Sequence, residues 1–148
     1  MSITDITDIT EDFVNERVAL AIEKHHAGYN CAQAVACALC DLYGADEDAV
    51  FRVSEGFGAG MGSMQNVCGA VSGALILAGL KNSGGKDAEP RTKSATYGLS
   101  KAMTAEFAKL NGTLICSELK GIKTGKPLRS CDGCIEDAVR IALSVLGK

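Results

Sequence analysis

The chain has 148 residues, enough for one domain with a buried core, and 47% of them are hydrophobic and 22% charged, as in ordinary globular proteins. Its formal net charge of −3 argues against a general nucleic-acid binder, which needs a basic surface. The sequence has no tryptophan and only 5% aromatic residues, which argues against a surface on which bases stack.

The N-terminus carries Asp5 and Asp8 and lacks the basic and apolar regions of a signal peptide. The most apolar run, residues 67–80, contains several glycine and serine residues and is too short for a membrane span. We therefore expect a cytoplasmic protein without a membrane span. We expect one domain over residues 1–148, in which residues 1–10 form a flexible N-terminal arm.

The N-terminal third of the chain is predicted to be helical. Apolar residues recur at helical spacing over residues 11–27, and Thr10 precedes them as a plausible N-cap. Asn30 is predicted to cap a second helix, because Gln33 stands three residues later in the pattern of a capping box. This second helix is expected to continue through Tyr43.

Residues 46–54 are predicted to form a short third helix, and a glycine-rich loop follows over residues 56–63. The loop lacks the Gly-Lys-Ser/Thr ending of a phosphate-binding P-loop. Its glycines instead indicate that the backbone approaches another element or a sulfur site. A fourth helix is predicted over about residues 64–80, and its small side chains at 69–74 favour close packing against another helix.

A fifth helix is predicted to extend to residue 110, with Pro90 in its first turn. A short turn is expected to hold Cys116, and a polar loop over residues 121–129 leads to a last helix over 131–146. No segment shows the period-two alternation of a β-strand. We therefore predict an all-α fold, a compact bundle of five or six helices with a glycine-rich loop.

The chain contains seven cysteines, which is a high number for a cytoplasmic protein. In a reducing compartment this number indicates metal binding or redox chemistry rather than structural disulfides. Cys31, Cys68 and Cys131 lie in or near the first turns of predicted helices, where free N–H groups and the helix dipole lower a thiol pKa. Redox attack and metal ligation both require a thiolate, so these positions favour a functional role over packing.

Two Cys-x-x-Cys pairs are present. Cys131 and Cys134 open the last predicted helix, a position that permits a reversible disulfide in thioredoxin-like proteins, although no βαβ context surrounds them here. Cys37 and Cys40 lie within the second helix on other faces than Cys31, so we expect them to pack in the core. Neither pair is followed by histidine, which excludes covalent c-type haem.

The polar segment between Cys116 and Cys131 carries four basic residues, Lys120, Lys123, Lys126 and Arg129. They form either a solvated loop or a positive surface that stabilises thiolates or attracts an anionic substrate. His25 and His26, at the end of the first predicted helix, are expected to be structural or exposed rather than metal ligands.

Several strings of this sequence resemble the motifs of the redox-active C_GCAxxG_C_C proteins. These strings are GYNCAQAV at 28–35, GAGMG at 58–62 and CGAVSGA at 68–74, followed by Asn111-Gly112 and by Cys116 and Cys131. The resemblance covers nearly the whole chain, with Val67 before the name-giving motif as a departure. It implies that the four characteristic cysteines are Cys31, Cys68, Cys116 and Cys131, with Cys134 as an addition. A similar arrangement in split-Soret cytochromes is associated with an iron–sulfur site.

Three hypotheses of function follow. In the first, the chain carries out thiol–disulfide exchange, with Cys31 or Cys131 attacking and a neighbouring cysteine resolving, and its partner is a redox protein or a small-molecule thiol. In the second, the chain is a metal- or iron–sulfur-binding electron carrier, and its four ligands, which come from several helices, are Cys31, Cys68, Cys116 and Cys131. The possible cofactors at these cysteines are an iron–sulfur cluster or zinc, of which only the cluster transfers electrons. In the third, the chain is a structural interaction protein with inert cysteines. A homodimer is compatible with each.

Overall fold

The computed structural model describes residues 9–148, so most of the arm predicted over residues 1–10 lies outside the described residues. The N-terminal half contains helices α2 (Glu11–His26), α3 (Cys31–Leu39), α4 (Glu47–Ser54) and α5 (Gly58–Met61), with 3-10 turns at Cys40–Tyr43 and Glu55–Phe57. The C-terminal half contains α6 (Gly69–Asn82), α7 (Lys93–Asn111), α8 (Cys116–Lys120) and α9 (Cys131–Leu146). No strand is found among residues 9–148, which confirms the all-α class.

Local capping sets the starts of three helices that were predicted from the sequence. The hydroxyl of Thr10 accepts a hydrogen bond from the N–H of Phe13 at the start of α2. At the start of α3, Asn30 and Gln33 form the predicted capping box, in which each side chain accepts from the other residue's N–H. Ser130 accepts from a backbone N–H of α9 in the same way.

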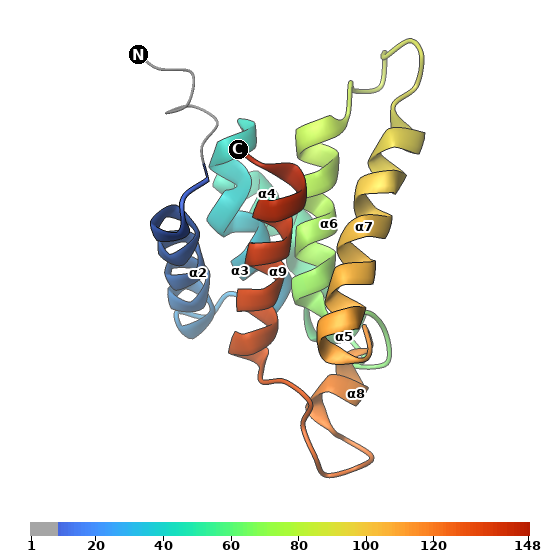
Figure 1. Cartoon of the computed structure of the whole chain (residues 1–148). Coiled ribbons are helices and arrows are strands. Elements are labelled where there is room, and N and C mark those ends of the chain that lie inside the picture. Colours follow the sequence, from blue (N-terminus) through green and yellow to red (C-terminus); the bar gives the residue numbers. More distant parts are fainter. Residues whose placement is uncertain (1–8) are drawn as a thin grey trace.

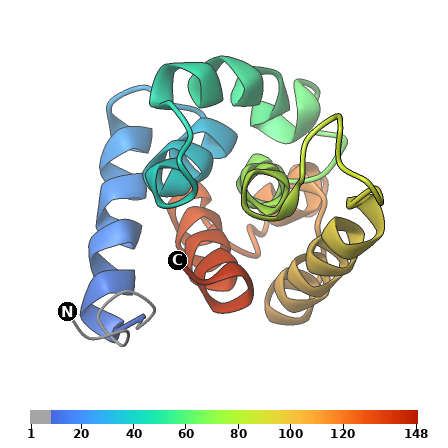
Figure 2. The same ribbon diagram turned by 90° about the horizontal axis from the view of Figure 1, so that it is seen from above.

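Helix α9 lies at the centre of the bundle and contacts α2, α3, α6 and α7 (Figure 1). Seen from above, α2, α3, α6 and α7 form an arc around it (Figure 2). The core between them consists of fully buried apolar side chains, among them Leu39, Leu77, Met103, Phe107, Ile135 and Leu143. Within residues 9–148, no helix combines the length and the apolar character required to cross a membrane.

Helices α3 and α6 pack closely because glycines face their contact. A Cβ at Gly73 would stand 2.6 Å from the carbonyl oxygen of Ala32, and a Cβ at Gly69 would stand 3.3 Å from the Cβ of Cys31. The small side chains predicted to form a packing surface therefore do so. This approach also brings the starts of α3 and α6, which both carry cysteines, side by side.

Helix α6 begins at Gly69, and the predicted start near residue 64 is wrong. The backbone before it is extended and pairs with the segment before α8: Val67 forms an isolated antiparallel bridge with Ile115. The N–H of Cys68 donates to the carbonyl of Leu114 at 2.7 Å. These tertiary hydrogen bonds compete with helix formation, so Cys68 becomes the N-cap of α6 instead of a first-turn residue.

Three further features differ from the predictions. The α-helix predicted to continue through Tyr43 ends at Leu39, and a 3-10 turn follows over Cys40–Tyr43. Pro90 lies before α7, which starts at Lys93 after the N-cap Thr92. The segment predicted as a glycine-rich loop over residues 56–63 contains a 3-10 turn and the single turn α5. The end of α7 at Asn111, followed by Gly112 with φ of 81°, agrees with the predicted stop.

Candidate functional site

Five of the seven cysteines line one cavity of about 190 Å³. They are the five that the sequence singled out: Cys31, Cys68, Cys116, Cys131 and Cys134. Cys37 and Cys40 are buried elsewhere, beside α2 and the start of α4. All seven cysteines are free thiols in this structure.

The cavity lies where four helices begin, at the end of the bundle opposite the C-terminus (Figure 1). Cys31, Cys116 and Cys131 are the first residues of α3, α8 and α9, and Cys68 is the N-cap of α6. Cys134 follows Cys131 by almost one helical turn. The fold thus gathers positions that are dispersed over a hundred residues of sequence.

The cysteines differ in their access to solvent. Cys31 and Cys131 are half-buried, whereas the exposed fractions of Cys68, Cys116 and Cys134 are 5%, 5% and 3%. The first two therefore lie nearer the surface and the other three form the inner wall of the cavity.

A left-handed turn forms another part of the wall. Ala59 and Gly60, with φ of 52° and 57°, both adopt the left-handed region, and Met61 and Gly62 continue it. Consecutive left-handed residues are rare because the conformation costs about 1–2 kcal/mol for each residue with a side chain. The turn places Gly60 directly against Cys116, so the strained backbone belongs to the cavity itself.

Cys68 has a lowered pKa of about 7. The main cause is a hydrogen bond with the Cys134 thiol, which favours the Cys68 thiolate and outweighs the effect of burial. The N–H groups of Ala70 and Val71 in the first turn of α6 lower the pKa further, although no hydrogen bond of normal geometry caps that helix. Cys68 is thus thiolate in a substantial fraction of molecules at neutral pH.

The other cavity thiols are shifted the opposite way. Burial raises the pKa of Cys31 to about 12, and the negative charges of Cys131 and Cys68 add to the effect. The expectation that the helix start lowers the pKa of Cys31 is therefore wrong. Burial and the neighbouring negative charges raise this pKa by more than the helix dipole lowers it. The pKa of Cys134 is raised by its hydrogen bond to Cys68, and that of Cys116 by burial.

Lys120 supplies a positive charge to the cavity. Burial acts to lower the pKa of Lys120. The negative charges that Cys131, Cys116 and Cys31 carry as thiolates outweigh burial, so the pKa is raised. Among the four basic residues singled out in this region, Lys120 and Arg129 line the cavity. Lys123 and Lys126 are exposed and belong to the solvated loop.

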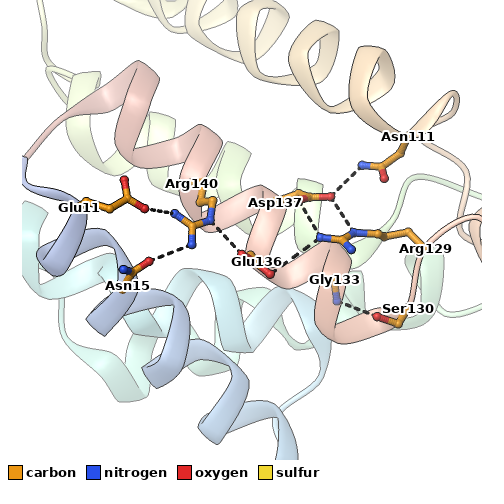
Figure 3. Close-up of polar contacts among 9 residues, drawn as sticks. All are labelled: Glu11, Asn15, Asn111, Arg129, Ser130, Gly133, Glu136, Asp137 and Arg140. Atoms are coloured by element: carbon orange, nitrogen blue, oxygen red, sulfur yellow. Dashed lines mark hydrogen bonds and ion pairs between the residues drawn. The ribbon is translucent and has the colours of Figure 1, made fainter.

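Arg129 is held at the start of α9 by Asp137 (Figure 3). Its Nε and Nη2 each donate to the Asp137 carboxylate at 3.1 Å, and Asn111 of α7 donates to the same carboxylate at 3.1 Å. A Cβ at Gly133 would stand 2.5 Å from Arg129 Nε, so glycine is needed there for the guanidinium to cross the helix.

A second arginine ties α9 to α2 along the same face (Figure 3). Arg140 donates to Glu136 of its own helix and to Glu11 and Asn15 of α2. These contacts and those of Arg129 fix the position of α9, which contributes two cysteines to the cavity.

His25 is a cavity residue that sequence reasoning missed. Its Nε2 lies 4.0 Å from the sulfur of Cys31, and its Nδ1 lies 2.9 Å from Asp132 Oδ1. His26, which is exposed as expected, contacts the other oxygen of Asp132 at 2.7 Å. The signal available in the sequence was the placement of both histidines at the end of a helix, shortly before Cys31.

A comparison with protein families assigns most of the chain to a known family model. The family model described as "Putative redox-active protein (C_GCAxxG_C_C)" matches residues 29–145, which include all five cavity cysteines. No curated protein matches the chain, and no solved structure does.

Proposed function

The chain belongs to the C_GCAxxG_C_C family, and we propose that it carries out thiol–disulfide exchange with Cys68 as the attacking sulfur and Cys134 as the resolving sulfur. The observation that supports this assignment is that both cysteines line the buried wall of one cavity, where the Cys134 thiol lowers the pKa of Cys68 to about 7. An attacking thiol works best with a pKa near ambient pH, because it is then both ionised and strongly nucleophilic. Cys31, with a pKa of about 12, is a weaker candidate for attack.

The reaction that we propose consumes a substrate disulfide. The Cys68 thiolate attacks one substrate sulfur, which forms a mixed disulfide and releases the other substrate sulfur as a thiolate. Cys134 then attacks Cys68, forming the Cys68–Cys134 disulfide and releasing the second substrate thiolate, to which the Cys134 proton passes. Two electrons have moved from the cysteine pair to the substrate, and a reducing dithiol reverses the change.

The cavity sets limits on this substrate. Its volume of about 190 Å³ is smaller than the roughly 300–1,000 Å³ of most ligand pockets. Only the disulfide end of a molecule therefore fits beside Cys68. The Lys120 ammonium at the wall favours a substrate with carboxylates, so an anionic small-molecule disulfide is the probe of choice.

A trapping experiment tests the proposal. Reduced Cys134→Ser protein, mixed with oxidised glutathione, should accumulate a mixed disulfide on Cys68 that mass spectrometry locates by peptide mapping. Wild type should proceed to the Cys68–Cys134 disulfide, and Cys68→Ser should release no glutathione. Cys37→Ser, which removes a thiol buried outside the cavity, is the matched control and should behave as wild type. Equal glutathione release by Cys68→Ser and wild type would refute the assignment.

A second candidate function, electron transfer through an iron–sulfur cluster, is favoured by the number of cysteines around the cavity. Exchange uses two thiols, whereas [2Fe–2S] and [4Fe–4S] clusters are held by four, and Cys31, Cys68, Cys116 and Cys131 come from four helices. Within the described part of the chain, no three cysteine sulfurs lie within 4.8 Å of one another. Tetrahedral zinc requires sulfurs about 3.8 Å apart, so three of these sulfurs would have to move closer together to bind a zinc ion. A bound cluster would supply one-electron transfer.

Protein purified without oxygen tests this second function. A cluster requires iron and acid-labile sulfide in the protein and visible absorption that decreases on reduction. Colourless protein without iron or sulfide, even after reconstitution with both, would exclude the cluster.

A further inference from the structure

We propose that His25, His26 and Asp132 form a binding site for a divalent transition-metal ion beside the cysteine cavity. The donor atoms of the three side chains all lie within 4.8 Å of one another. Nδ1 of His25 is 2.9 Å from one oxygen of Asp132, and Nε2 of His26 is 2.7 Å from the other. The inference depends on these three residues and not on the thiol chemistry proposed above.

The donor set matches the chemistry of such ions. Two imidazoles and one carboxylate bind zinc and non-haem iron in many proteins, with the remaining coordination positions left to water or substrate. The side chains of His25, His26 and Asp132 are 25%, 64% and 39% exposed, so water can reach the ion. The site is therefore of the open kind rather than the closed structural kind.

The distances require only a small adjustment. Zinc–ligand bonds of about 2.1 Å in a tetrahedron separate the donor atoms by about 3.4 Å. The two nitrogen–oxygen distances in the structure are 2.9 and 2.7 Å, so each must lengthen by roughly half an ångström for an ion to replace the hydrogen bonds. Rotation of the exposed His26 ring can accommodate this change.

The fold places this cluster, since its members are far apart in sequence. His25 and His26 occupy the last turn of α2, and Asp132 occupies the first turn of α9, 107 residues after His25. The two hydrogen bonds already hold the end of α2 against the start of α9. An ion at this point would strengthen the same junction.

The site is linked to the cavity through His25. A histidine whose Nδ1 holds a metal carries its ring hydrogen on Nε2. In this structure Nε2 of His25 faces the sulfur of Cys31 at 4.0 Å. Metal binding would therefore fix the tautomer in which the N–H of His25 faces Cys31.

Zinc titration followed by NMR tests the site directly, because the chain has only two histidines. In reduced protein labelled with ¹⁵N, added Zn²⁺ should shift Nδ1 of His25 and Nε2 of His26, while the remaining nitrogen of each ring keeps its hydrogen. Zinc bound to cavity thiolates alone leaves the His26 nitrogen unshifted, so the two kinds of binding are distinguishable.

Variants complete the test. His26→Gln and Asp132→Asn should each weaken the zinc affinity seen at His25 by more than about tenfold, since even residues behind a ligand contribute that much. Glu23→Gln, which alters an exposed carboxylate on α2 outside the cluster, is the matched control and should bind as wild type. Circular dichroism of each variant verifies folding. Unshifted histidine nitrogens in the wild-type protein, or wild-type zinc affinity at His25 in both variants, would overturn the proposal.

Discussion

Gly60 lies against Cys116 so closely that a Cβ at Gly60 would stand 2.5 Å from the Cβ of Cys116 and 3.4 Å from its sulfur. Gly60 also has φ of +57°, which side chains rarely adopt. Two independent requirements, space and backbone conformation, therefore select glycine at this position. The preceding residue, Ala59, shares the left-handed conformation but is exposed.

The substitution Gly60→Ala should destabilise the protein by about 2–4 kcal/mol, since the left-handed conformation and the forced contact each cost about 1–2. Ala59→Gly is the matched control. It relieves strain at the adjacent residue but increases the entropy of the unfolded chain, so its free energy of unfolding should stay within about 1 kcal/mol of wild type. Urea denaturation measures both; a Gly60→Ala variant as stable as wild type would contradict the packing described.

The reactivity of Cys68 should depend on pH with a midpoint of about 7. Below this pH the thiol is protonated and iodoacetamide reacts slowly; above it the thiolate predominates and the rate reaches a plateau. An unperturbed thiol titrates at about 8.5, and Cys31 should titrate only near 12. Peptide mapping of alkylated, reduced, metal-free protein gives each rate separately. A Cys68 midpoint at or above 8.5 would exclude the lowered pKa.

Lys120 contributes to this lowered pKa, so Lys120→Met should raise the midpoint of Cys68 alkylation. Lys123→Met removes an equal charge from the exposed loop and should leave the midpoint unchanged, because solvent screens charges there. The same alkylation assay applies. A shift of equal size in both variants would mean that net charge, rather than the position of Lys120, sets the pKa.

Cys116→Ser separates the two candidate functions. Exchange through Cys68 and Cys134 does not use Cys116, so the serine variant should still release glutathione at close to the wild-type rate. A cluster held by four thiolates would lose a ligand, and with it iron and folding stability. Glutathione release and iron content, measured on the same preparation, therefore give opposite results for the two functions.

Asp137→Asn should destabilise the protein by about 1–2 kcal/mol, because it removes the charge that two Arg129 N–H groups and Asn111 share. Asp137 is 14% exposed, which limits compensation by water. Asp87→Asn is the control, since its side chain is 86% exposed and its ion pair should contribute less than about 1 kcal/mol. Thermal unfolding compares the two variants with the wild-type protein. Equal Tm values for Asp137→Asn and Asp87→Asn would show that the contacts of Asp137 with Arg129 and Asn111 do not stabilise the fold.

Much of the helical structure could be predicted from the sequence, because it depends on neighbouring residues. The bounds of α9 and the capping box of Asn30 and Gln33 follow from side chains that bond the nearest free N–H groups. The stop at Gly112 follows from the same local rule. The sequence motifs also indicated the family and the five cysteines that line the cavity, since their order along the chain is itself the signal.

Only the tertiary structure decided which cysteines lie around one cavity and which of them has a lowered pKa. The sequence placed Cys31, Cys68 and Cys131 alike at helix starts, yet the pKa is lowered at Cys68 and raised at Cys31. Burial and the neighbouring sulfur determine the difference, and both come from helices distant in the chain. The late start of α6, set by the pairing of Val67 with Ile115, has the same origin. The charge of a thiol and the first residue of a helix depend on the residues that pack against them. In this fold those residues are distant in the chain, so a local sequence pattern does not reveal them.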